Sequence, residues 1–229
     1  ALSSAASDVY KRQLPLQPFR DKIKILPNAM DESNFILQEG DKEQIEKIKS
    51  QYNNKKIIFF VGRHIQYKGL PYLIEAEKYI KGECEIVIAG QGPLTEDLKK
   101  QCNSKRVHFV GKLSDDELRW HHYAASIFAF PSITKNEAFG VALAEAMYCY
   151  TPAVTFTIPG SGVNWVSLNN ETGLEVANKD VKSYAQAIDT LLSNDNLCKQ
   201  FAKAGHNRVK ENFTITKMIK LIEQYYTEI

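Results

Sequence analysis

The sequence lacks the marks of a membrane-spanning, secreted or metal-binding protein. No apolar run approaches the roughly 20 residues that cross a bilayer, and the N-terminus has no apolar core of a signal peptide. The four cysteines form no close pair, and no Cys/His spacing matches a zinc site. These absences favour a reducing, cytoplasmic location, although four cysteines would also allow two bridges in a secreted protein.

The chain also lacks a charge imbalance. Its 229 residues include 29 Lys and Arg against 27 Asp and Glu, a net charge of +2. This balance gives no argument for nucleic acid or an anionic membrane as a partner, so any basic site must be local. With 44% hydrophobic and 24% charged residues, the composition is that of a globular domain.

Residues 1–13 show no apolar periodicity. The stretch SAASDVYKRQ (4–13) resembles translated sequencing-adapter DNA of the kind found at the ends of metagenomic reading frames. An ordinary disordered tail or a short helix is the alternative. We interpret 1–13 as a non-native or disordered tail and expect the gene to continue upstream.

Beyond this tail, short apolar strands alternate with helices. A linker with a first short strand is expected over 14–40. Strands are predicted at 57–62, 84–90, 106–111, 126–131 and 151–156. Helices are predicted at 41–51, 70–80, 93–103, 114–125, 139–147, 180–193, 195–211 and 216–229. The alternation predicts an α/β fold, a Rossmann-like parallel sheet with helices on both faces over 41–211, followed by a C-terminal helix within 212–229.

Two glutamates eight residues apart are the most informative feature of the chain. Glu137 and Glu145 belong to the segment EAFGVALAEAM (137–147), where small apolar residues surround the second carboxylate. Such a carboxylate is costly to bury unless it meets solvent or a ligand with donors. If the intervening residues are helical, the two carboxylates lie roughly 12 Å apart along the axis. That span suits a ligand with polar groups at both ends.

Cations follow the first strand of the predicted sheet, in the loop GRHIQYKG (62–69). Gly62 lets the backbone approach a ligand closely, and Arg63 and Lys68 suit phosphate oxygens. Two solvated surface cations are the alternative. The loop does not contain a Walker-type phosphate motif.

The segments that follow the other predicted strands could also bind a ligand through their backbone N–H groups. The turn after the second strand is GQGP (90–93), and Lys112 and Leu113 follow the third. The backbone N–H groups of Phe139, Gly140 and Val141 would lie at a helix N-terminus, which suits a phosphate.

The histidines support no metal site. His121 and His122 are neighbours on a predicted helix, so they point about 100° apart, and we expect helix-surface or domain-contact residues. His64 lies in the loop 62–69, where it would either touch a ligand or be exposed.

The order GR…KG, GxGP and PS…E-x7-E resembles family-4 retaining glycosyltransferases of the GT-B fold. The resemblance covers about 22–229 and corresponds to the C-terminal, donor-binding half of those enzymes. It implies a UDP- or GDP-sugar donor and no metal cofactor. The implied catalytic residues are Arg63, Lys68 and Glu137, with Arg63 and Lys68 on the diphosphate and Glu137 on the donor sugar. The implied donor-binding residues are Glu145 on the ribose, the Lys112 and Leu113 backbone on the base, and Gly62, Phe139, Gly140 and Val141.

The implied activity is transfer of a hexose with retention to a glycan or lipid-linked acceptor in bacterial surface polysaccharide synthesis. The acceptor would bind through an N-terminal domain missing here, so this fragment is expected to bind nucleotide weakly without turnover. The terminal helix would pack on that domain, and peripheral contact with the inner membrane face fits such a role. A nucleotide-sugar 2-epimerase of the same fold and a non-catalytic nucleotide-binding module are the alternatives.

One segment departs from the family pattern. Small residues, often Ala-x-Gly, usually follow the E-x7-E helix, whereas this chain has Tyr148, Cys149 and Tyr150. A glycine ends a helix cheaply in the left-handed conformation. The same conformation at Tyr150 would be strained.

Overall fold

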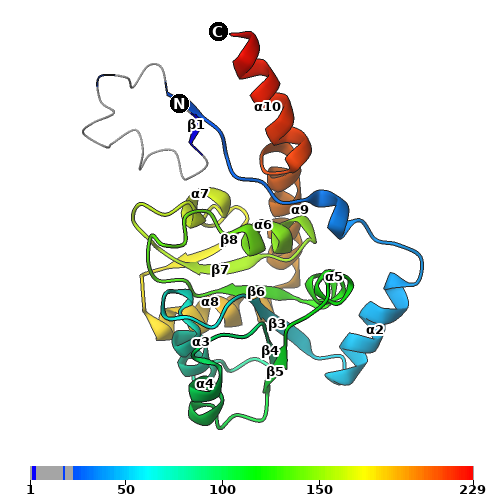
Figure 1. Cartoon of the computed structure of the whole chain (residues 1–229). Coiled ribbons are helices and arrows are strands. Elements are labelled where there is room, and N and C mark those ends of the chain that lie inside the picture. The colour runs from blue at the N-terminus through cyan, green and yellow to red at the C-terminus, as the bar shows by residue number, and fades with distance from the viewer. Residues whose placement is uncertain (1, 4–17, 19–22, 229) are drawn as a thin grey trace.

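The computed structural model, which describes residues 2–3, 18 and 23–228, confirms the predicted α/β architecture (Figure 1). Six parallel strands form one sheet in the order β5-β4-β3-β6-β7-β8. The strands of this sheet are β3 (Lys56–Val61), β4 (Cys84–Ala89), β5 (Val107–Gly111), β6 (Ile127–Phe130), β7 (Ala153–Phe156) and β8 (Gly173–Val176). The α-helices of the described residues are α2 (Asp41–Gln51), α3 (Leu70–Glu77), α4 (Thr95–Gln101), α5 (Asp115–Ala124), α6 (Val141–Tyr148), α7 (Val163–Val166), α8 (Val181–Ser193), α9 (Asp195–Asn212) and α10 (Ile215–Thr227).

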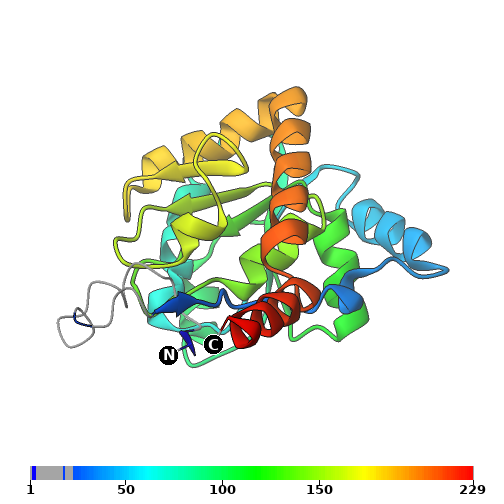
Figure 2. The ribbon, with the colours of Figure 1, turned by 90° about the horizontal axis from the view of Figure 1, so that it is seen from above.

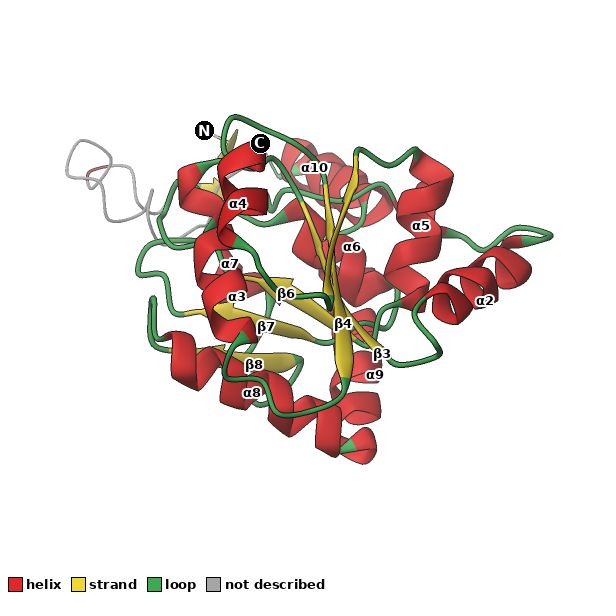
Figure 3. Cartoon of the chain, turned by 90° about the horizontal axis from the view of Figure 1, so that it is seen from below, coloured by secondary structure: helices red, strands yellow, loops and turns green. Residues whose placement is uncertain are grey.

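Helices cover both faces of the sheet, which explains why its central strands are continuously apolar. In β3 the run Ile57 to Phe60 is buried throughout. Helix α3 packs with α4 and α8 on one face, and α5 packs with α6 on the other, as Figure 3 shows from below. Helix α9 contacts both α8 and α6 and so closes the end of the sheet near β8.

The strand order creates a switch point between β3 and β6. The chain lays down β3, β4 and β5 toward one edge, then returns to the other side of β3 to form β6. The pairing of Ile58 with Ile127 fixes this junction. The loops that leave β3 and β6 therefore start side by side, and such a point is where open parallel sheets bind ligands.

Local signals set the helix starts. Ser114 caps α5: its Oγ accepts from the Glu117 N–H at 3.3 Å, and Glu117 Oε2 accepts from the Ser114 N–H at 2.8 Å. The predicted helix at 139–147 begins later, at Val141, because Gly140 holds a left-handed φ of 89° before it. Glu137 therefore lies in a loop, and the helical spacing of 12 Å does not apply.

The segment before α2 is tied to the last helix. It contains the short strand β2 (Lys24–Ile25) and the 3₁₀ turn η2 (Glu32–Phe35). Glu32 accepts from the N–H groups of Ile215 and Thr216 at the start of α10. The Tyr225 hydroxyl donates to the Ile25 carbonyl at 3.0 Å, and Figure 2 shows α10 alongside β2.

Two parts of the chain differ from expectation or lie outside the description. Strand β8 was not among the predicted strands, since GLEV is too short to show a period. Strand β1 (Leu2–Ser3) pairs in parallel with β2. The rest of the predicted tail at 1–13 lies outside the described residues.

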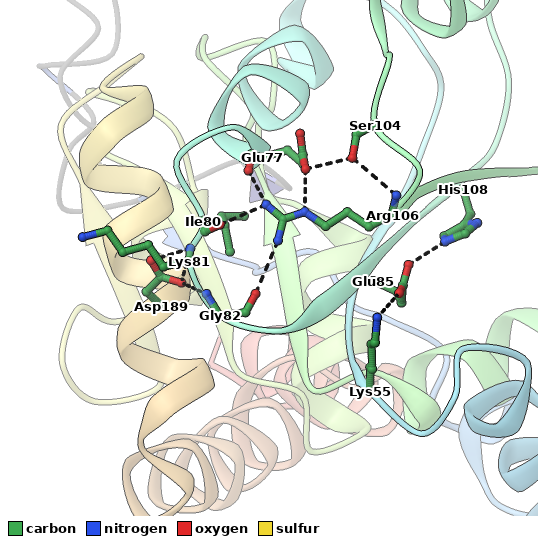
Figure 4. Close-up of polar contacts among 10 residues, drawn as sticks. All are labelled: Lys55, Glu77, Ile80, Lys81, Gly82, Glu85, Ser104, Arg106, His108 and Asp189. Atoms are coloured by element: carbon green, nitrogen blue, oxygen red, sulfur yellow. Dashed lines mark hydrogen bonds and ion pairs between the residues drawn. The ribbon is translucent and has the colours of Figure 1, made fainter.

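Polar side chains brace the opposite, amino edge of the sheet (Figure 4). Arg106, just before β5, donates to Glu77 Oε1 at 2.5 Å and to the Ile80 carbonyl at 2.9 Å. Asp189 of α8 accepts from the Gly82 N–H at 2.9 Å. A cavity of about 690 Å³ lies at this edge, yet it contains none of the predicted site residues.

Candidate functional site

The loops after β3 and β6 are locked together at the switch point. The loop after β3 includes the 3₁₀ turn η3 (Gln66–Lys68) and ends at Gly69, whose φ is 68°. A Cβ on Gly69 would lie 1.9 Å from the Pro131 carbonyl oxygen, so only glycine fits. The Ile133 N–H also donates to the Tyr67 carbonyl at 2.9 Å. Two segments far apart in sequence thus form one surface.

Lys68 and Glu137 form an ion pair on this surface. Lys68 Nζ donates to Glu137 Oε2 at 2.5 Å, and Ser132 Oγ donates to the same oxygen at 3.0 Å. Their side chains are only 14% and 9% exposed. The ammonium also lies 5.4 Å from the Phe130 ring centre. Ser132 was not among the predicted residues; a serine after a buried strand carries too little signal by itself.

Glu137 keeps one oxygen uncommitted. Both recorded side-chain contacts reach Oε2, and within residues 23–228 no donor pairs with Oε1. Lys68 likewise has three N–H donors and gives one to Glu137. The pair can therefore accept from a hydroxyl with Glu137 and donate to an anion with Lys68 at the same point.

A small cavity lies on the other side of β3, over the exits of β4 and β5. Its volume is about 250 Å³, and it brings together four predicted residues, namely Gly62, Arg63, Lys112 and Leu113. Gly90 allows this approach, because a Cβ there would lie 2.0 Å from the Gly62 carbonyl oxygen. Arg63 is exposed, and its guanidinium has no hydrogen-bond partner in the part of the chain that the structure describes. It is free to contact a ligand at the cavity mouth.

The start of α6 offers backbone donors beside the ion pair. Phe139 is buried against Phe213 at 5.4 Å, and it holds the turn in place. Within residues 23–228, the N–H groups of Phe139, Gly140 and Val141 have no recorded acceptor. Together with the dipole of α6 they favour an anion there.

Glu145 lies on α6 with its side chain 19% exposed. Burial, and after it the charge of Asp115, raises the pKa of this carboxyl to about 7. Neither carboxylate oxygen has a hydrogen bond among residues 23–228; the nearest basic group is His122 Nε2, 3.9 Å from Oε2. A carboxylate that is mostly buried and lacks donors is a strong acceptor for ligand hydroxyls.

Two histidines are placed differently from their predictions. His64 is buried rather than exposed: its Nδ1 lies 2.9 Å from Thr95 Oγ1, so it ties the β3 exit to α4. His122 is fully buried, whereas a helix-surface or domain-contact position was expected. His121 is half-buried and stacks on Phe59. Polar residue type suggested exposure, and tertiary packing overrode it.

The predicted strain at the end of α6 is present. Tyr150 has a φ of 60°, and the Thr151 N–H donates to the Ala146 carbonyl at 3.0 Å in a helix-ending turn. The Tyr150 ring stacks on His206, with centres 3.9 Å apart and planes at 9°. This stacking offsets part of the backbone cost.

A search of the described residues finds no group of three or more His, Cys, Asp or Glu side chains placed to hold a metal ion. The same residues include no helix that is long and apolar enough to cross a membrane.

The comparisons with known proteins agree on one family. The chain is 24% identical to the O-antigen chain mannosyltransferase C of Escherichia coli over 93% of its length, covering 57% of that protein. It is 26% identical to the UDP-Gal:alpha-D-GlcNAc-diphosphoundecaprenol alpha-1,3-galactosyltransferase of Escherichia coli over its whole length, covering 59% of that protein. The chain thus spans a little over half of these curated relatives.

A solved structure shares the fold. The structure of Anabaena Alr3699/HepE in complex with UDP and glucose matches the whole chain with a TM-score of 0.83 and 18% identity, covering 63% of that chain. Residues 41–208, which include all six strands of the sheet and most of its helices, match the family described as Glycosyl transferases group 1. The chain belongs to this glycosyltransferase family and has its GT-B, Rossmann-like fold.

Proposed function

We propose that this chain is the donor-binding half of a family-4 retaining glycosyltransferase. It would bind a UDP- or GDP-sugar and transfer its hexose to a glycan or lipid-linked acceptor in the synthesis of a bacterial surface polysaccharide. The observation that carries the proposal is the Lys68–Glu137 pair at the switch point. Arg63 lines the cavity over the neighbouring strand exits, and Glu145 lies on α6, the helix that follows the Glu137 loop.

The proposed roles of the four charged residues follow from their surroundings. Lys68 and Arg63 would hold the diphosphate and stabilise the negative charge that grows as it leaves. Glu137 would accept hydroxyls of the donor sugar through its uncommitted Oε1. Glu145 would accept the ribose hydroxyls, which supply the donors that its buried carboxylate lacks. The cavity beside Lys112 and Leu113 would take the base.

The reaction would proceed on one face of the sugar. The bond between the anomeric carbon and the diphosphate oxygen breaks, the acceptor hydroxyl oxygen bonds to that carbon, and its proton passes to the leaving phosphate. Retention follows because entry and departure share a face. Glu137 then positions the sugar and forms no covalent adduct.

The relatives support this choice of substrate. Their names describe mannosyl and galactosyl transfer in O-antigen and diphosphoundecaprenol-linked glycans, and a structural neighbour was solved with UDP and glucose. A cytoplasmic site of action, in peripheral contact with the inner membrane face, fits a lipid-linked acceptor. The acceptor would bind to a second domain, so the chain alone should bind nucleotide without turnover.

Calorimetric titration with UDP, GDP and ADP tests the proposal. One of the first two should bind, and Glu145→Ala should weaken that binding by about ten-fold or more for a lost hydrogen bond to a charged group. Lys182→Ala, at an exposed lysine of α8 that lies over the Tyr79 ring and does not line the site's cavity, is the matched control and should bind as the wild type does. No binding of any nucleotide would refute the proposal.

A further inference from the structure

His122 is an unsatisfied polar group in the core. Its side chain is fully buried, and in the part of the chain that the structure describes neither Nδ1 nor Nε2 has a hydrogen-bond partner. Three aromatic rings surround it, with centres 5.6, 5.2 and 5.5 Å away, and they belong to Phe35, Phe59 and Phe128. Burial lowers the pKa of this imidazole to about 3, so the ring is neutral.

A buried imidazole without partners needs a reason. Most buried polar side chains are hydrogen-bonded, and leaving one unpaired is costly. The apolar surroundings of His122 would accept a phenyl ring of nearly the same shape without that cost. The histidine therefore weakens the ligand-free fold, and a hydrogen-bond partner in a ligand-bound state would give it a function that offsets this cost.

Within residues 23–228, the acidic side chain that lies within 4 Å of the His122 ring is Glu145. Nε2 lies 3.9 Å from Glu145 Oε2, which is too long for a hydrogen bond and close enough for a side-chain rotation to make one. The two residues face each other across the contact between α5 and α6. Since the imidazole is neutral, the contact is a potential N–H donor to a carboxylate and not an ion pair.

We propose that His122 positions Glu145 for nucleotide binding by donating its Nε2–H to Oε2 of the carboxylate. The inference rests on the proposed role of Glu145 as the ribose acceptor. With Oε2 of Glu145 bonded to His122, its Oε1 and the remaining lone pairs of its Oε2 are available to accept from the two ribose hydroxyls. Binding of the nucleotide and formation of the His122–Glu145 bond then support each other, because both favour the ionised carboxylate.

The test compares His122→Phe with wild type at pH 8, by thermal denaturation and by titration with whichever of UDP and GDP the wild type binds. His122→Phe should keep or raise the melting temperature, because it removes the unpaired nitrogens. It should weaken nucleotide binding about ten-fold, the equivalent of one hydrogen bond to a charged group. If His122 served only in packing, its replacement by phenylalanine would not raise the melting temperature and weaken nucleotide binding together.

Three further variants sharpen the result. His122→Gln, which restores an N–H donor, should recover part of the affinity. His121→Phe, on the same helix, is the matched control and should bind as the wild type does. In the Glu145→Ala background, His122→Phe should cause no further loss, since the two residues act through one contact.

The outcomes separate the two proposals. If the wild type binds nucleotide and His122→Phe binds equally well, the positioning role is refuted while the proposed function stands. If the wild type binds none of the nucleotides, the proposed function fails, and the positioning role fails with it.

Discussion

Lys68 Nζ lies 2.5 Å from Glu137 Oε2, although the two residues come from loops on opposite sides of the chain reversal in the sheet. Both side chains are largely shielded from water. The pair therefore serves the fold as well as the proposed chemistry, and removing either partner has two separable effects.

Lys68→Met should lower the free energy of unfolding by about 3 kcal/mol, because it leaves the Glu137 carboxylate buried without its cation. Urea denaturation measures this loss. The double variant Lys68→Met/Glu137→Leu should be more stable than Lys68→Met alone, since no charge is left behind. Simple addition of the two single losses would contradict a direct coupling between the residues.

Arg63→Ala should leave the free energy of unfolding within about 0.5 kcal/mol of wild type, as expected for an exposed side chain with no hydrogen-bond partner among residues 23–228. Binding of UDP or GDP should weaken about ten-fold, because the guanidinium would contact the diphosphate. The matching nucleoside, uridine or guanosine, provides the internal control. Its weaker binding should be unchanged, and an equal loss for nucleoside and nucleotide would place Arg63 on the base instead.

Nucleotide affinity should depend on the ionisation of Glu145. The pKa of its carboxyl is about 7, and ribose hydroxyls donate to the ionised form. Affinity for a nucleotide-sugar should therefore rise with pH toward a plateau above 7, and fall by up to about ten-fold per unit below it. Binding near pH 6.5 should release a proton, which calorimetry in buffers of different ionisation enthalpy detects.

The free energy of unfolding should also depend on the ionisation of Glu145, but it should fall as the pH rises. The folded pKa of Glu145 lies above the ordinary value of 4.5 for a glutamate carboxyl, so its contribution to stability is fully present below about 4.5 and is lost as the pH rises through about 7. Glu145→Gln should remove this decline and the pH dependence of binding together. A wild-type and Glu145→Gln pair with parallel stability curves from pH 5 to 8 would show that the carboxyl titrates normally.

The left-handed conformation of Tyr150 predicts an unusual order of substitutions. Both Tyr150→Gly and Tyr150→Ala remove the ring that stacks on His206. Glycine adopts the φ of 60° without strain, whereas alanine does not. Tyr150→Gly should therefore be about 1 kcal/mol more stable than Tyr150→Ala in thermal or urea denaturation. The reverse order is normal for a helix interior and would rule out the left-handed turn.

Much of the fold could be predicted because local sequence patterns favour the same strands and helices that the folded chain contains. The apolar run at Ile57 to Phe60 predicted a buried strand, and the Ser114–Glu117 capping box fixed the start of α5. The E-x7-E segment predicted a helix over 139–147, and α6 occupies most of that range. Helix α6 began two residues late because the conformation of Gly140 depends on the packing of the preceding loop.

The parts that escaped prediction depend on distant contacts. The Lys68–Glu137 pair joins residues 69 positions apart, and only the strand order brings them together. The burial of His64 and His122 likewise follows from the elements packed around them. Histidine is a polar residue type, so the sequence pointed to exposure. The structure is needed to show that these side chains lie in the core.

The close approach of Gly69 to Pro131 has a mechanical consequence. Because no side-chain atom separates the two backbones there, we expect the loop that carries Lys68 and the loop that carries Glu137 to move together. A ligand that displaces Lys68 should then displace Glu137 as well. Gly69→Ala should push the two loops apart and so separate the two side chains, while both charged residues remain in the chain.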